Sequence, residues 1–207
     1  MKLSLSSSSV AEATTACLVI AVTEDGPFSP SAEAVDQASG GTLSRLVKSR
    51  DVSTSLGKTT MLHGLTGLAA ERVLTIGLGK AAKLDRARWD RACLAAGKAL
   101  RDHPITECHV FAHDLDIEGT DPRWRLRQLA LALQRANYLY TSTKPLKDDA
   151  PVPLKSAVFS DGQDAGSALE EARGMAVGFI KARHLGDLPP NICNPAYIAQ
   201  EARAIAE

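Results

Sequence analysis

The sequence lacks a net charge, a long apolar run and any Cys-x-x-Cys pair, and each absence excludes a class of protein. Lys plus Arg and Asp plus Glu both number 24 in 207 residues, so the basic excess that holds nucleic acid or anionic lipid is missing. The longest apolar run, residues 16–22, is far shorter than the roughly 18–20 residues that cross a bilayer, so we expect no membrane partner.

The four cysteines are too scattered to indicate a metal ribbon or a redox pair. They are Cys17, Cys93, Cys108 and Cys193. Two disulfides are arithmetically possible, but serines and Glu12 interrupt any apolar segment near the start, so no secretion signal is predicted. We therefore expect reduced, mostly buried thiols and a cytoplasmic location.

Strand and helix patterns alternate along most of the chain. Residues 16–22 are apolar on both faces, which is typical of a central strand covered by helices. Asp85 and the pair Asp121-Pro122 are typical helix starts. The expected strands are 2–6, 16–22, 59–63, 72–78, 106–112 and 155–160. This order predicts an α/β domain with a largely parallel or mixed sheet.

The pattern changes after Asp161. A long helix is predicted there, followed by an extended connection at Leu188-Pro189-Pro190-Asn191 and a final helix that begins at Pro195. On the long helix, Gly174, Gly178 and Ala182 lie four apart; they either admit a close neighbour or reflect local tolerance of glycine. The final apolar stripe runs on to Glu207 without a stop signal, so we expect a longer protein, with a frayed natural end as the alternative.

Two glycine motifs and one acidic loop resemble ligand sites only in part. Gly57-Lys58-Thr59 ends like a phosphate loop, but Val52 replaces the first glycine and a strand follows. The turn Gly77-Leu78-Gly79-Lys80 lacks the third glycine of a dinucleotide fingerprint. Residues 114–119 imitate a calcium loop whose twelfth position is Arg125, so an acidic surface loop is the better interpretation.

Histidines and arginines give no clear site either. His109 and His113 are placed on one face of a strand, about 13 Å apart by strand rise, which is too distant to share a metal unless the strand bends. Arg123, Arg125 and Arg127 are interpreted as a solvated helical face, with nucleic-acid contact as the alternative. Residue chemistry alone therefore assigns no catalytic, cofactor-binding or metal-binding residue.

One segment carries a family resemblance. Residues 182–199 closely resemble the domain junction of leucyl (cytosol) aminopeptidases, the M17 metallo-aminopeptidases. The resemblance lies in Arg183-x-Leu185, the turn Pro189-Pro190-Asn191 and the helix start Asn194-Pro195-Ala196-Tyr197-Ile198-Ala199. Residues 72–80, together with Glu24-Asp25-Gly26 and residues 43–48, resemble earlier parts of the same family. The resemblance thus covers nearly the whole chain.

The resemblance implies a three-layer α/β/α macro-like accessory domain over residues 1–162. Residues 163–207 would be a connecting helix and the start of a C-terminal catalytic domain. The family's catalytic signature, Asn-Thr-Asp-Ala-Glu-Gly-Arg-Leu, is absent here. We therefore predict no catalytic, cofactor-binding or metal-binding residue on this segment.

For the intact protein, the resemblance implies release of N-terminal residues, leucine preferred, from peptide substrates with two divalent ions, manganese or zinc. It also implies a hexamer in which this segment serves assembly and active-site access. The alternatives are a macro-like module that binds an ADP-ribose-type ligand near Gly77–Gly79 and a DNA-binding accessory domain that uses Arg123, Arg125 and Arg127.

Overall fold

The computed structural model describes residues 1–145 and 150–206, and its centre is one six-stranded sheet. The strand order is β1-β6-β5-β2-β4-β3. The strands are β1 (Lys2–Ser6), β2 (Leu18–Val22), β3 (Thr59–His63), β4 (Arg72–Gly77), β5 (Glu107–Val110) and β6 (Ser156–Ser160). All pairs are parallel except β3 with β4, so the prediction of a mixed sheet is confirmed.

Strand β2 lies inside the sheet, between β4 and β5, and all five of its residues are buried. Its side chains alternate between two hydrophobic clusters. Val19 and Ala21 contribute to the larger cluster, and Leu18, Ile20 and Val22 contribute to the smaller one. A strand that faces apolar side chains on both sides must itself be apolar throughout, which explains the uninterrupted run in the sequence.

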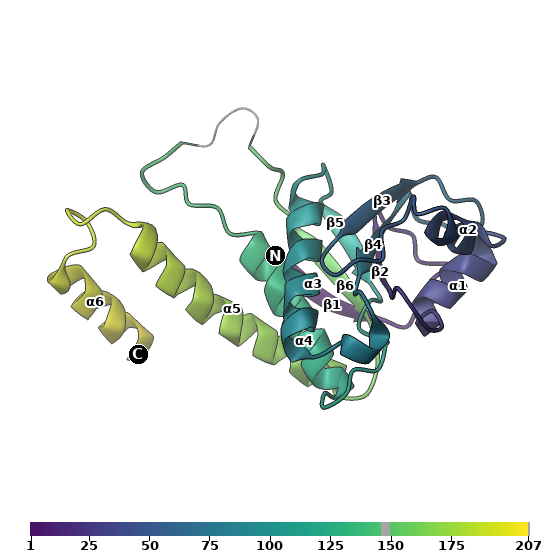
Figure 1. The fold of residues 1–207 in the computed structure, drawn as a ribbon. Helices are drawn as coiled ribbons and strands as arrows, with labels where there is room; N and C mark the ends of the chain where they lie inside the picture. The colour runs from purple at the N-terminus through teal and green to yellow at the C-terminus, as the bar shows by residue number, and fades with distance from the viewer. Residues whose placement is uncertain (146–149, 207) are drawn as a thin grey trace.

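Helices cover both faces of the sheet and complete three layers (Figure 1). Helices α1 (Pro30–Ala38) and α2 (Thr42–Lys48) pack on the smaller cluster. Helices α3 (Arg86–Arg101), α4 (Pro122–Ala136) and the first half of α5 (Ala165–Asp187) pack on the larger one. The predicted α/β/α architecture is confirmed.

Capping residues begin the helices as the sequence predicted. The side chains of Asp85 and Asp121 accept hydrogen bonds from the amides of Arg88 and Trp124, at 2.8 and 2.6 Å. Helix α4 ends at Ala136. The reason is Asn137, whose amide side chain pairs with both backbone groups of Leu154 at 2.8 and 2.9 Å.

Helix α5 leaves the domain and carries α6 (Pro195–Ala206) beside it (Figure 1). The extended connection predicted at residues 188–191 is confirmed at Leu188, whose backbone is extended, but not at the end of that segment. There the amides of Ile192 and Cys193 both donate to the carbonyl oxygen of Pro189 at 2.9 Å and close a turn. An ion pair between Lys181 and Glu201 then joins the two helices. Glu207, where the final pattern ends, lies outside the described residues.

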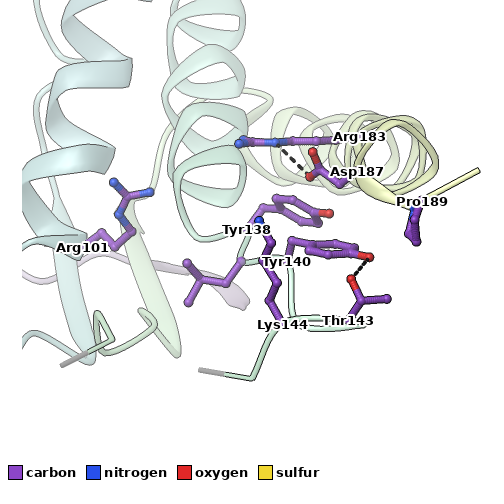
Figure 2. Close-up of a pocket in the computed structure, with 9 residues that line it drawn as sticks. Arg101, Tyr138, Tyr140, Thr143, Lys144, Arg183, Asp187 and Pro189 are labelled. Atoms are coloured by element: carbon purple, nitrogen blue, oxygen red, sulfur yellow. Dashed lines mark hydrogen bonds and ion pairs between the residues drawn. The ribbon is translucent and has the colours of Figure 1, made fainter. Parts of the chain in front are cut away.

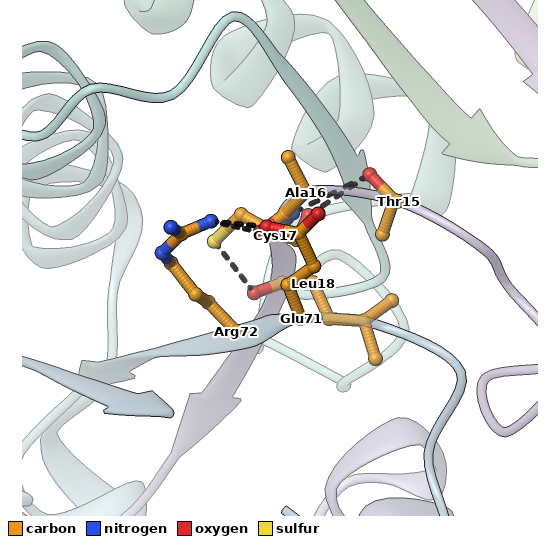
Figure 3. Close-up of polar contacts among 6 residues, drawn as sticks. All are labelled: Thr15, Ala16, Cys17, Leu18, Glu71 and Arg72. Carbon is orange, nitrogen blue, oxygen red and sulfur yellow. Dashed lines mark hydrogen bonds and ion pairs between the residues drawn. The ribbon is translucent and has the colours of Figure 1, made fainter. Parts of the chain in front are cut away.

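The described chain contains no helix long and apolar enough to cross a membrane. The four cysteines are free thiols, and three of them are buried, as predicted. Figure 3 shows Cys17 at the entrance to β2, where its Sγ donates to the carbonyl oxygen of Leu18 at 3.4 Å and Arg72 donates to that of Ala16. Burial raises the pKa of Cys17 to about 12, so this thiol is not a nucleophile.

Candidate functional site

The two glycine motifs pack against each other. The amides of Gly77, Leu78 and Gly79 donate to the carbonyl oxygens of Lys58, Val22 and Thr54, at 2.8–2.9 Å. The Gly57 amide donates in turn to the Gly77 carbonyl oxygen at 2.9 Å. These turn amides are therefore occupied by the chain itself, and the turn does not offer them to the phosphate of an ADP-ribose-type ligand.

Gly77 is required for packing. A Cβ there would meet the Ser55 carbonyl oxygen and would lie only 2.7 Å from the carbonyl carbon of Thr54. Backbone atoms cannot yield as a flexible side chain can, so only glycine fits between β4 and residues 53–55. The glycine pattern that resembles a nucleotide fingerprint is thus explained by close backbone approach.

Asp114 occupies the N-terminus of α1. Its Oδ2 accepts a hydrogen bond from the Ser31 amide at 2.5 Å. Burial raises the pKa of Asp114, and hydrogen bonds from Ser31 and Ser29 partly offset that rise. An internal carboxylate therefore takes the position in which a helix N-terminus would receive an external anion. The expected acidic surface loop is only partly exposed, since Leu115 and Ile117 are buried beside it.

Arg125 is buried, so the prediction of a solvated arginine face is wrong for this residue. Its side chain is 4% exposed and donates to the His113 carbonyl oxygen and to Thr120 Oγ1, both at 3.2 Å. Its ion partner is Asp116, at 3.5 Å. Burial is tolerated because each side of the guanidinium finds an acceptor.

Arg123 and Arg127, the other two members of that cluster, both pair with Glu171 of α5; the Arg127 distance is 2.5 Å. Glu171 thereby ties α4 to α5, and the guanidinium of Arg127, followed by that of Arg123, lowers the pKa of its carboxyl. Each of the three arginines therefore pairs with a carboxylate of the chain itself.

His113 and His109 do not lie on one strand as predicted. Strand β5 ends at Val110, and the chain then turns, with the Asp114 amide bonded to the Phe111 carbonyl oxygen at 3.2 Å. His113 is 8% exposed and its Nε2 lies 3.2 Å from Ser160 Oγ. Burial lowers its pKa to about 4. His109 instead stacks on Phe111, with ring centroids 4.4 Å apart.

Two cavities open at the carboxyl edge of the parallel strands, where ligands of open α/β sheets usually bind. One, of about 320 Å³, lies beside Phe28 and Leu78. The other, of about 310 Å³, lies between His113, Arg125 and Ser160. Asp114 and Asp116 line both cavities. From the sequence, His113, Arg125 and residues 114–119 were each considered separately and predicted no shared site, although the run His113-Asp114-Leu115-Asp116 just after a strand was a usable signal.

A third cavity, of about 500 Å³, lies where α5 leaves the domain (Figure 2). Tyr138, Arg101 and Asp187 line it. The guanidinium of Arg183 lies 4.9 Å from the Tyr138 ring centroid and pairs with Asp187 at 3.8 Å. Tyr140 bonds Thr143 at 2.9 Å. This cavity marks the junction between the domain and its connecting helix.

Beyond that junction the helices expose apolar side chains. Val177 on α5 is 70% exposed and Ile205 on α6 is 71% exposed, with Met175, Ile192 and Ile198 also open to solvent. Helix α6 has no buried residue. A Cβ at Gly174 or Gly178 would have no neighbour within 4 Å, so in the described chain no element packs closely against these two glycines.

No group of three or more His, Cys, Asp or Glu side chains that could hold a metal ion is found in residues 1–145 and 150–206. Within that part of the chain, the arrangement at the sheet edge offers charged and hydrogen-bonding groups without a metal cage. The geometry therefore defines a three-layer α/β domain with small polar cavities at its carboxyl edge and an exposed helical extension.

Comparisons with known proteins assign the family. Residues 19–146 match the N-terminal domain of the cytosol aminopeptidase family. A probable cytosol aminopeptidase of Xanthomonas campestris pv. campestris (strain B100) is 37% identical over 206 residues, which cover 100% of this chain and 41% of that relative. The chain belongs to the cytosol aminopeptidase family, and it spans about two fifths of the length of the curated relatives it matches.

Solved structures support the fold. A mutant of tomato leucine aminopeptidase superposes with a TM-score of 0.76 at 20% identity, and the alignment covers 100% of this chain and 42% of the tomato chain. The bottromycin maturation enzyme BotP in complex with Mn superposes with a TM-score of 0.69 at 20% identity, and the alignment covers 93% of this chain and 36% of BotP. The macrodomain of Mycobacterium tuberculosis DarG superposes with a TM-score of 0.55 at 15% identity, and the alignment covers 78% of this chain and 99% of the macrodomain. At these identities the similarity shows a shared macro-like fold.

Proposed function

We propose that the intact protein releases N-terminal amino acids from peptides, with leucine preferred, and that this chain is its non-catalytic N-terminal domain. The observation that carries the proposal is the match of residues 19–146 to the N-terminal domain of the cytosol aminopeptidase family. The end-to-end alignment with relatives more than twice as long supports it, because those relatives have room for a separate catalytic part.

The proposed chemistry uses two divalent ions, manganese or zinc, held by residues outside this chain. Two such ions activate a water molecule and polarise the scissile carbonyl. The BotP structure with Mn supports a metal-dependent family. The described residues of this chain provide no donor set of the kind that two ions need.

The proposed organisation is an accessory domain over residues 1–162 and a connection over residues 163–207 to the protein's own catalytic domain. The exposure of Val177, Ile198 and Ile205 supports this proposal, because a partner domain would cover these large apolar side chains. We also propose a cytoplasmic hexamer in which this segment contributes contacts between subunits and shapes access to the active sites.

The test is hydrolysis of amino-acid p-nitroanilides by the complete gene product in the presence of manganese. The proposal expects turnover, fastest with the leucine substrate, that EDTA abolishes and metal restores. An N-acetylated leucine p-nitroanilide is the matched control and should not be cleaved. Turnover that persists in EDTA, or no preference for a free amino terminus, would contradict the proposed activity.

A further inference from the structure

The cavity of about 310 Å³ at the carboxyl edge, here called the edge cavity, has the size of a site for a small molecule. His113 and Asp114 approach it from the segment after β5, Arg125 from α4, and Ser160 and Asp161 from the end of β6. Three separate segments of the chain thus bring polar side chains to one cavity.

Several of these groups lack a partner. Asp114 Oδ1 and His113 Nδ1 are buried and make no hydrogen bond to any residue that the structure describes. Buried polar atoms without partners are uncommon because each costs free energy, and His113 is more than nine-tenths buried. The guanidinium of Arg125 is buried too, yet its ion partner Asp116 has a fully exposed side chain.

The N-terminus of α5 reaches the same cavity through Ala165. The Ala165 amide is occupied, because it donates to the Gly162 carbonyl oxygen at 3.2 Å. This helix start therefore adds a positive partial charge near the cavity, without a free amide from the residue that lines it.

The charges of the cavity select the kind of ligand. Asp114, Asp116 and Asp161 repel a purely anionic ligand, and Arg123 and Arg125 repel a purely cationic one. A ligand with one ammonium and one carboxylate close together meets both signs. Pro122, Leu126 and Ala165 add an apolar wall that suits a small aliphatic side chain.

We infer that the edge cavity binds a free α-amino acid with a small aliphatic side chain. Asp114 and Asp116 receive the ammonium group. The carboxylate is held by Arg125, and the side chain lies against Leu126. The neutral imidazole of His113 supplies a hydrogen-bonding nitrogen and adds no charge that would repel the ammonium.

This inference does not rest on the proposed aminopeptidase activity, because it concerns binding to the described chain. The two are connected in one respect: the product of the proposed hydrolysis is a ligand of this chemical class. Occupation of the edge cavity would then let the accessory domain sense accumulated product. A negative result in the peptidase assay would not affect the binding inference, which is tested separately by calorimetry.

The test is isothermal titration calorimetry of the 207-residue chain with leucine, leucinamide and isocaproate. Leucinamide lacks the carboxylate, and isocaproate lacks the amine. The inference expects leucine to bind and each analogue to bind about tenfold more weakly or worse, since each loses a charge-assisted contact. Absence of binding by leucine, or equal binding of the three compounds, would overturn it.

A matched pair of variants tests the contact assigned to Asp116. Asp116→Asn removes the charge of a fully exposed side chain that lines the edge cavity, and Glu118→Gln removes one from an exposed residue of the same loop that does not line it. Leucine affinity should fall about tenfold in the first variant and stay unchanged in the second. Equal affinities in both variants would contradict that contact. The analogue series decides the ligand class even if a variant folds poorly.

Discussion

The carboxylate of Asp114 accepts a hydrogen bond at 2.5 Å from the backbone amide of Ser31, which lies 83 positions earlier in the chain. This contact joins the segment after β5 to the first turn of α1, across the sheet edge. Asp114 thus accepts a hydrogen bond from a first-turn amide of α1, as an N-cap residue does, although it is distant in the sequence.

The Asp114 contact should contribute to stability. We expect Asp114→Ala to lower the free energy of unfolding by about 1–2 kcal/mol, because the Ser31 amide loses its acceptor. Urea denaturation followed by circular dichroism measures this change. Glu118→Ala, at an exposed position of the same loop, is the control and should change stability by less than about 0.5 kcal/mol. Equal effects in the two variants would remove the assigned role of Asp114.

Gly77→Ala should be strongly destabilising, whereas Gly174→Ala should not. A methyl group at Gly77 meets the backbone of residues 54 and 55, and overpacking of this kind costs about 1–3 kcal/mol. At Gly174, in the middle of α5, the methyl group meets open space, and alanine favours the helix by up to about 1 kcal/mol. Thermal unfolding should therefore shift in opposite directions. A shift of the same sign in both variants would contradict the packing explanation.

Glu171→Gln should loosen α5. The substitution weakens both ion pairs, to Arg123 and to Arg127, that hold α5 on α4. Hydrogen exchange measured by mass spectrometry should become faster in residues 165–187. Glu170→Gln is the matched control, because Glu170 pairs only within α5, with Arg173. Unchanged exchange in Glu171→Gln would show that apolar packing alone fixes the helix.

His113 should make the domain sensitive to acid. Its folded pKa is about 4 against an ordinary 6.5, so between these values the unfolded chain binds a proton that the folded chain does not. Stability is therefore lost as pH falls from 6.5 to 4, at up to about 1.4 kcal/mol per pH unit and roughly 3 kcal/mol in all.

The measurement for His113 is the free energy of unfolding as a function of pH for wild type and His113→Gln. The variant should lose less stability than wild type across this window, because glutamine does not titrate. His63→Gln, at the exposed end of β3, should follow the wild-type curve. Parallel curves for wild type and His113→Gln would show that the buried imidazole does not couple to folding.

The sequence predicted the sheet and its helices well, because β2 and the capped helices carry local signals. It failed where a long-range contact decides the outcome. Nothing near Arg125 indicates that Thr120 and the His113 carbonyl oxygen would surround it, and nothing near Gly77 indicates the approach of residues 53–55. The edge cavity was missed for the same reason, since it forms only when β5, β6, α4 and α5 come together.

The central claim is that this chain supports catalysis without performing it. The most direct test is leucine p-nitroanilide hydrolysis by the purified 207-residue chain with manganese, beside the complete gene product at equal concentration. The account predicts no hydrolysis above the buffer rate for the chain and metal-dependent hydrolysis for the complete product. Hydrolysis by the chain itself that EDTA abolishes and manganese restores would contradict it.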